Sequence, residues 1–226
     1  MRHYDSINRI QDDGFLLGES VWAFNKLDGQ NFAVKYNPRK NVFDSFGSRK
    51  RMVDENDEQF GSAVRYFKES CIPETLSKLV KENSGKKGLF SGIDEITFYF
   101  EWFGEHSFAG RHDPSDELKL YLIDIFLKKK GYIEPKQYYE IFCNDERLDT
   151  PELIYKGILT NDFVKEIWDN DWTKEDCKYP MVKEGVVCRM SHLMKGQRLP
   201  KVKFKTKWWI DRLHELYTEE ECKELE

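Results

Sequence analysis

The stretch Asn25-Lys26-Leu27-Asp28-Gly29-Gln30-Asn31-Phe32 places a lysine at the end of a strand-like run and directly before an Asp-Gly turn. A glycine in such a turn lets a ligand approach the backbone closely. A lysine attacks an electrophile only after losing its proton, and burial or nearby cations, including a bound metal, lower its pKa. The segment predicts a nucleophilic Lys26. The alternative is an ordinary hairpin turn with a solvated lysine.

Strand-like runs and breaks continue on both sides of this turn. The runs cover residues 20–26, 31–36 and 42–46, and Asp28-Gly29 and Asn37-Pro38 separate them. Together they predict an antiparallel meander.

The rest of the chain alternates helical and strand-like patterns. Helices are expected at 58–69, 74–82, 136–143, 152–155, 162–168 and 208–225, and strands at 96–103, 118–127, 182–190 and 201–205. This order favours an α+β architecture around antiparallel sheets over a doubly wound parallel sheet. No Pro-, Gly- or Ser-rich linker divides the chain, so we expect residues 1–226 to form a single domain.

Composition excludes several classes of protein. The net charge is −5, so contact with nucleic acid has to come from local basic strips. The five cysteines form no C-x-x-C pair, and the five histidines show no metal-binding spacing. The N-terminus is polar, and no apolar run has the length of a membrane span. We therefore expect a cytoplasmic protein without membrane contacts.

Two carboxylates lie beside glycines at strand ends. In Phe103-Gly104-Glu105, the carboxylate of Glu105 could bind a ribose hydroxyl or the water shell of a metal. Glu101, earlier in the same strand, is interpreted as a charged residue that faces solvent. In Lys183-Glu184-Gly185-Val186-Val187, Glu184 could hold Mg²⁺ through water, and a polar strand edge is the alternative.

Basic residues gather in three further segments. In Lys201-Val202-Lys203-Phe204-Lys205 the alternation puts Lys203 and Lys205 on one face, where a triphosphate would relieve their repulsion. The alternative is a basic edge strand that faces solvent. Arg49-Lys50-Arg51 could contact phosphates of a polynucleotide, whereas Lys128-Lys129-Lys130 is interpreted as a solvated turn.

The order and spacing of these segments resembles the lysine nucleotidyltransferase superfamily of DNA ligases, RNA ligases and mRNA capping enzymes, from about Glu19 to Trp209. Lys26 to Phe32 and Phe103 to Gly110 look most like the phage nick-sealing (double-strand) RNA ligases. The resemblance implies an ATP-grasp-like adenylation domain with antiparallel sheets and flanking helices. Three features depart from that pattern: an aliphatic Ile123 where an aromatic is frequent, Asn25 in place of Glu, and too short a C-terminus for an OB-type domain.

The resemblance also implies roles for individual residues. Lys26 would form the phosphoramide bond to AMP, Glu105 would bind ribose, and Ile123 would pack on the adenine. The implied nucleotide-binding set is Lys26, Asp28, Gly29, Asn31, Arg49, Glu105, Ile123, Glu184, Lys203 and Lys205, and the implied metal-binding set is Asp28, Glu105 and Glu184. Within the first set, Arg49 would contact phosphate, and Lys203 and Lys205 would grip the α-phosphate.

The function implied is that of an ATP-dependent RNA ligase using Mg²⁺ or Mn²⁺. Its substrates would be RNA ends carrying a 5′-phosphate and a 3′-hydroxyl, including those of a nicked duplex, and a protein partner could supply extra nucleic-acid contacts. The host cytoplasm is the expected location if the chain is viral. Three alternatives remain open: a small ATP-dependent DNA ligase, a GTP-using capping guanylyltransferase, and a non-catalytic nucleic-acid-binding module.

Overall fold

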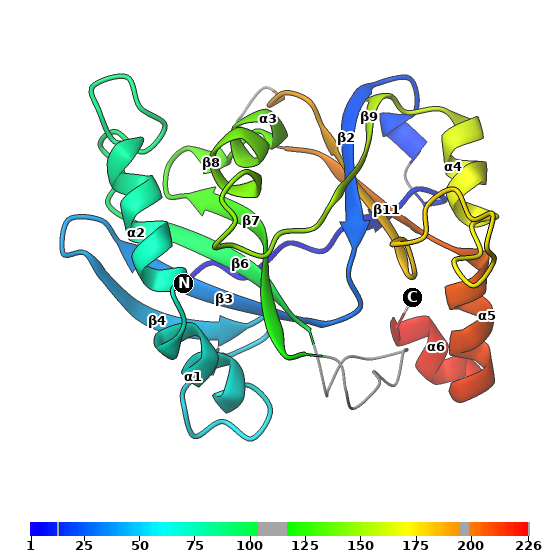
Figure 1. Cartoon of the computed structure of the whole chain (residues 1–226), viewed down its shortest axis with the longest axis horizontal. Helices are drawn as coiled ribbons and strands as arrows, with labels where there is room; N and C mark the ends of the chain where they lie inside the picture. Colours follow the sequence, from blue (N-terminus) through cyan, green and yellow to red (C-terminus); the bar gives the residue numbers. More distant parts are fainter. Residues whose placement is uncertain (13, 104–116, 195–198, 226) are drawn as a thin grey trace.

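Two β-sheets form the frame of the molecule (Figure 1). The structure is a computed structural model that describes residues 1–12, 14–103, 117–194 and 199–225, with residues 223–225 described by their backbone alone. The first sheet has the order β1-β11-β10-β2-β9, and the second has the order β5-β4-β3-β6-β7-β8. Within the described residues, all strand pairs are antiparallel except β1 with β11, which is parallel. The predicted α+β architecture with antiparallel sheets is confirmed.

The strands of the first sheet are β1 (Asn8–Arg9), β2 (Ser20–Lys26), β9 (Leu153–Ile158), β10 (Gly185–Met190) and β11 (Lys201–Lys205). Those of the second sheet are β3 (Gln30–Asn37), β4 (Val42–Ser48), β5 (Met52–Val53), β6 (Ile96–Phe103), β7 (Lys119–Leu127) and β8 (Gly131–Tyr132).

The Asp28-Gly29 turn connects the two sheets. β2 ends at Lys26 in the first sheet, and β3 begins at Gln30 in the second. The predicted meander is therefore wrong for β2 and β3, although β3 and β4 do form the expected hairpin. The reason lies in β2, which is buried on both faces: Trp22 and Phe24 enter one apolar cluster, and Ala23 enters another. Both edges of β2 are taken by β9 and β10.

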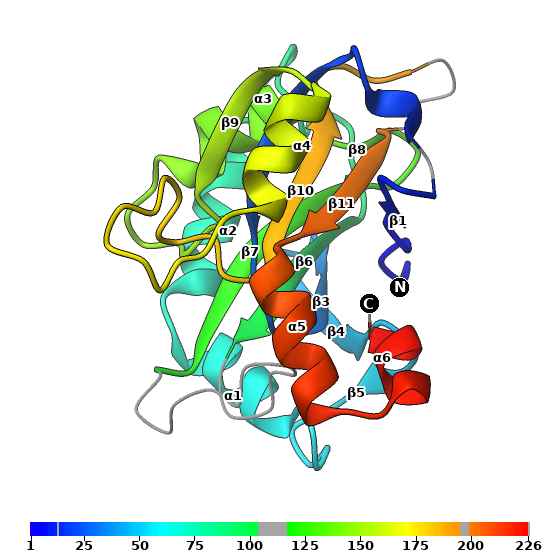
Figure 2. The same ribbon diagram turned by 90° about the vertical axis from the view of Figure 1, so that its right-hand side faces the viewer.

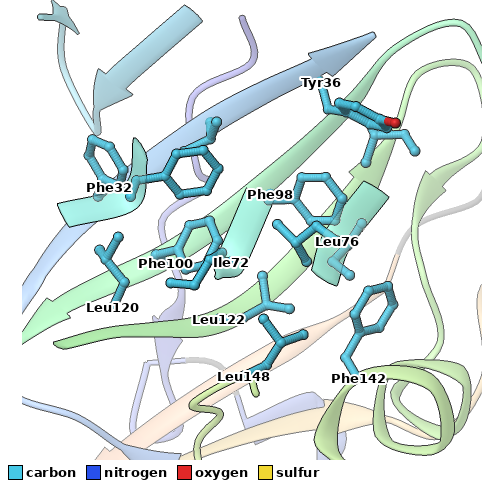
Figure 3. Close-up of a cluster of buried hydrophobic side chains, with 14 of the residues drawn as sticks. Phe32, Tyr36, Ile72, Leu76, Phe98, Phe100, Leu120, Leu122, Phe142 and Leu148 are labelled. Atoms are coloured by element: carbon cyan, nitrogen blue, oxygen red, sulfur yellow. The ribbon is translucent and has the colours of Figure 1, made fainter. Parts of the chain in front are cut away.

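An aromatic core covers one face of the second sheet (Figure 3). Because side chains alternate along a strand, Phe98, Phe100 and Trp102 of β6 enter this core. Ile72 and Leu76 of α2 (Ile72–Glu82) pack on the same cluster. Tyr99 and Glu101 alternate with these core residues, so they point to the other face of β6, which the functional site uses.

The helices cover the outer faces of the sheets (Figures 1 and 2). Beside the second sheet lie α1 (Gly61–Glu69), α2, and α3 (Pro135–Tyr138), which continues into a π-helical turn (Tyr139–Cys143). Beside the first sheet lie α4 (Asn161–Trp168) and α5 (Lys207–Leu216). The remaining elements are α6 (Glu219–Leu225) and a 3₁₀ turn (Gly14–Leu16). None of the helices in the described segments combines the length and apolar character needed to cross a lipid bilayer.

Two of the predicted helices differ in the structure. Residues 152–155 lie mostly in β9, because a run of Leu, Ile and Tyr fits the edge of a sheet. The predicted C-terminal helix is divided into α5 and α6 at Tyr217 and Thr218. Thr218 and Glu221 bond each other's backbone amides, which is a capping box that starts a new helix.

A buried ion cluster ties the two sheets and the N-terminal segment together. Asp124 of β7 is fully buried, accepts a hydrogen bond from Lys201 of β11, and lies 3.6 Å from the guanidinium of Arg189 in β10. The hydroxyl of Tyr4 also donates to Asp124, at 3.2 Å. Burial lowers the pKa of Lys201 to about 8 despite this partner. One carboxylate thus balances two buried cations across the interface between the sheets.

We predict that Asp124→Asn lowers the free energy of unfolding by about 3–5 kcal/mol, because it leaves Lys201 and Arg189 buried without a counter-charge. Urea denaturation measures this value. The control is Asp44→Asn, which breaks a partly exposed 2.9 Å pair with Lys35 and should change stability by less than about 1 kcal/mol. Equal, small losses in both variants would show that the cluster does not hold the sheets together.

Candidate active site

A cavity of about 620 Å³ is lined by both sheets, the N-terminal segment and α5. Eight of the ten residues predicted to bind nucleotide line it together: Lys26, Asp28, Gly29, Asn31, Arg49, Glu184, Lys203 and Lys205. Ile123 lines a smaller cavity of about 90 Å³, which also contacts Lys26. Glu105 lies outside the described residues.

Lys26, Glu184 and Lys205 form the centre of this cavity. The ε-nitrogen of Lys26 lies 2.8 Å from Glu184 Oε1, and that of Lys205 lies 3.3 Å from the same oxygen. The register explains the contact, because Gly185 pairs with Lys26 on one side and with Lys205 on the other. Glu184 is 3% exposed, and its second oxygen, Oε2, makes no hydrogen bond within the described structure.

The environment of Lys26 keeps it charged. Burial disfavours the ammonium, but attraction by Glu184 and Glu101 outweighs burial, so the pKa of Lys26 is raised above its ordinary value. Burial thus acts in the direction expected from the sequence, and the two carboxylates act against it. Lys26 has to give up this proton before its amine can attack.

Glu101 is the carboxylate that sequence reasoning placed wrongly. It lines the cavity, pairs across the sheet with Asn31, and is not a solvent-facing end of a strand. Burial, with repulsion from Glu184 and Asp28, raises the pKa of Glu101 to about 8, although Lys26 opposes this shift. Alternation along β6 gave a signal for Glu101, but only the pairing with β3 shows that its face meets Lys26.

The two glycines of the predicted motifs act through packing. A Cβ at Gly29 would lie 2.6 Å from the carbonyl oxygen of Trp102, and one at Gly185 would lie 2.2 Å from that of Phe204. The space on the Cβ side of Gly29 is thus filled by β6, while Gly29 itself lines the large cavity. Both glycines allow the strands that carry the site residues to approach each other.

Cationic side chains line the side of the cavity formed by β11 and the β4–β5 connection. Burial lowers the pKa of Lys203 to about 8 and that of Lys205 to about 7, and Lys26 repels both. Lys205 also lies 3.4 Å above the ring of Trp209, a contact that favours its charged form. Arg49 donates a hydrogen bond to Ser6. An anion in this cavity would stabilise all of these charges.

Sequence reasoning missed Trp209 and Tyr4, which both line the cavity. The side chain of Thr206 caps α5 by accepting a hydrogen bond from the amide of Trp209, so the start of α5 places the indole under Lys205. Tyr4 and Ile7 are large apolar residues in a polar N-terminal stretch, which was the available signal. They line the small cavity next to Ile123 as well as the large one.

The carboxylates suit a cation held largely by water and phosphate. Among the described residues, no group of three or more His, Cys, Asp or Glu side chains is arranged to hold a metal directly. Asp28 and Glu184 nevertheless line one cavity, and Glu184 Oε2 is buried without a partner. Mg²⁺ commonly binds through one or two carboxylates together with waters and substrate phosphates, so these residues fit such an ion.

Comparisons with known proteins agree with this geometry. The family described as RNA ligase matches residues 19–207. No curated protein matches the sequence. Three structures of a Naegleria gruberi RNA ligase share the fold, and each is covered over 58% of its length. A variant with ATP and Mn has a TM-score of 0.64 and 17% identity over 95% of this chain, and a variant with AMP and Mn has a TM-score of 0.62 and 15% identity over 94%. The ligase with PPi has a TM-score of 0.62 and 17% identity over 95% of this chain. The chain thus spans 58% of the length of those structures.

We predict that Glu101 makes stability depend on pH. With a folded pKa of about 8, Glu101 keeps a proton that the unfolded chain loses near pH 4.5, so its stabilising contribution is lost as the pH rises from about 4.5 to 8. Between pH 5 and 7 the unmodified protein should therefore lose about 2–3 kcal/mol relative to Glu101→Gln. Urea denaturation at both pH values measures this difference. A difference that does not change with pH would rule out the raised pKa.

Proposed function

The chain belongs to the RNA ligase family, and we propose that it is an ATP-dependent RNA ligase in which Lys26 carries the adenylate. The observation that carries this proposal is the ion-paired group of Lys26, Glu184 and Lys205, which lies in a cavity lined by further cations. The relatives with ATP, AMP, Mn and PPi support it, because those are the ligands that such a reaction would use or release.

In the first step, the ε-nitrogen of Lys26 attacks the α-phosphorus of ATP. An N–P bond forms, the bond between the α-phosphorus and its bridging oxygen breaks, and pyrophosphate leaves. Lys205 and Lys203 are placed to neutralise charge on the transferring phosphate, which is the main task of the protein in phosphoryl transfer. Glu184 is the nearest acceptor for the proton that Lys26 releases, at 2.8 Å.

In the later steps, the adenylate moves to a 5′-phosphate end of RNA, and a 3′-hydroxyl attacks that activated end and releases AMP. Arg49 lines the same cavity as Lys26, so it is placed to contact the 5′-phosphate. At each step the protein contributes positioning and charge neutralisation.

For the nucleotide, we propose that the ribose role assigned to Glu105 belongs to Glu101, which shares the cavity with Lys26. The small cavity lined by Ile123 and Val187, beside Lys26, is the proposed place for the adenine. A bound Mg²⁺ or Mn²⁺, when present, would supply further neutralisation of phosphate charge. Asp28 and Glu184, with the predicted Glu105, would hold it.

The family membership favours RNA over DNA ends and over a capping reaction. A non-catalytic binding module would have no use for a buried lysine held between carboxylates. We propose further that residues 1–226 act as one adenylation domain, because both sheets line the cavity. A protein partner would add further contacts to the nucleic acid.

We predict that Lys26→Ala and Lys26→Arg both abolish transfer of labelled AMP from ATP to the protein. Arginine keeps the positive charge beside Glu184 but does not lose its proton, so it pairs without attacking. Denaturing electrophoresis after incubation with radiolabelled ATP and Mg²⁺ measures the label. Lys35→Ala, a β3 lysine paired with Asp44, is the control and should label normally. Persistent labelling of either Lys26 variant would refute the assignment, and labelling by GTP in place of ATP would favour a capping enzyme.

A further inference from the structure

A groove continues from the candidate active site around the outer edge of β11. β1 pairs with β11 through Asn8 and Arg9, and the amide of Ile10 donates to the carbonyl oxygen of Lys203. The chain then turns away, with the amide of Asp12 donating to the carbonyl oxygen of Arg9. Beyond this turn, two cavities of about 230 Å³ each lie beside Phe204 and Lys205. Figure 2 shows β1 along β11, with α4 and α5 beside the same strand.

The walls of this groove are apolar and aromatic. Trp168 at the end of α4 lines both cavities and is 37% exposed, although most tryptophan surface in folded proteins is buried. Phe204 also lines both, and Ile210 of α5 and Val164 of α4 each line one. An indole face is therefore available to a flat ligand beside the edge of β11.

The polar lining consists of cations and the two amides Gln11 and Asn161. Arg9, Lys203 and Lys205 line the cavity nearest the active site, and Lys165 lines the next one. None of the described residues that line either cavity is acidic, although the chain as a whole carries a net charge of −5. The groove therefore complements an anion locally.

The groove and the active site share two residues. Lys203 and Lys205 line the large cavity with Lys26 and also line the groove. The pKa of Lys203 is lowered by burial and by repulsion from Lys26, Arg9 and Arg49. Lys203 is therefore close enough to feel charges in the active site and in the groove. The phosphate backbone of a nucleic-acid strand that enters the active site can thus continue past Arg9 and remain in contact with positively charged side chains.

A single-stranded nucleic acid matches this combination of features. Proteins bind such strands with cations along the backbone and aromatic side chains against unstacked bases. Each cavity, at about 230 Å³, is smaller than the ~300–1,000 Å³ of drug-sized sites, and so suits one nucleoside better than a folded partner.

We propose that this groove is a nucleotide subsite for the 5′-phosphorylated RNA strand, in which Arg9 contacts a backbone phosphate and Trp168 stacks on an unpaired base near the 5′ end. The proposal rests on the proposed ligase function, because that function brings the 5′-phosphate end into the large cavity, which Lys203 and Lys205 line together with Arg49. The subsite would bind the RNA strand outside the cavity in which Lys26 is adenylated.

The test measures equilibrium binding of a 5′-phosphorylated, fluorescently labelled RNA oligonucleotide by anisotropy, without ATP. Trp168→Ala should raise the Kd about 5- to 50-fold, as expected from the loss of one base–aromatic stack. Trp168→Phe should recover most of the affinity, because phenylalanine keeps a stacking face. The control is Phe15→Ala, which removes a 46% exposed aromatic that lines a different cavity. Unchanged binding by Trp168→Ala, or an equal loss in Phe15→Ala, would overturn the proposal.

A series of oligonucleotides locates the stacked base. Each carries one abasic nucleotide within the first four positions from the 5′ end. The unmodified protein should lose affinity at one position, and Trp168→Ala should be insensitive to that same position. Position-dependent sensitivity that persists in Trp168→Ala would overturn the stacking assignment. Because no adenylation is needed, failure of this test is separate from failure of the ligase function, which the labelling of Lys26 reports.

Discussion

The shared contact of one carboxylate with two lysines organises the candidate site. Oε1 of Glu184 lies 2.8 Å from the ε-nitrogen of Lys26 and 3.3 Å from that of Lys205. The second oxygen, Oε2, makes no hydrogen bond within the described structure. This arrangement requires β10 to lie between β2 and β11 with Gly185 opposite both lysines. A side chain at Gly185 would meet the backbone of β11, so the glycine makes the contact possible.

The fold holds this contact at the boundary between two sheets. The turn after Lys26 carries the chain from the first sheet to the second, so Glu101 of β6 reaches the same cavity as Glu184 of β10. Asp124 balances buried cations from β10 and β11 and also accepts a hydrogen bond from Tyr4. The N-terminal segment is therefore held beside the candidate active site by the same ions that join the sheets.

Much of the site could be predicted because its chemistry is carried by short segments. Lys26, Glu184 and the alternating Lys203 and Lys205 each stand beside a turn, a glycine or a clear strand pattern. Glu101 was missed because a strand pattern shows which residues share a face but not which strand that face meets. Trp209 and Tyr4 contribute through the capping of α5 and through the path of the N-terminus, which only tertiary structure determines. The meander prediction failed for the same reason, since the apolar run from Val21 to Phe24 is typical of a strand buried on both faces but does not show which strands pair with it.

The charge state of Lys26 connects this structure to its proposed chemistry. Carboxylates stabilise the ammonium of Lys26, while burial and repulsion from Lys26 destabilise the charges on Lys203 and Lys205. The account therefore makes Glu184 the residue that holds Lys26 as an ammonium and that receives its proton when the amine attacks. Nuclear magnetic resonance titration of the Lys26 ε-amine in isotopically labelled protein measures this directly. The account predicts a pKa above the ordinary lysine value in the free protein and a lower pKa in Glu184→Gln. A pKa below the ordinary value in the free protein, unchanged by Glu184→Gln, would contradict it.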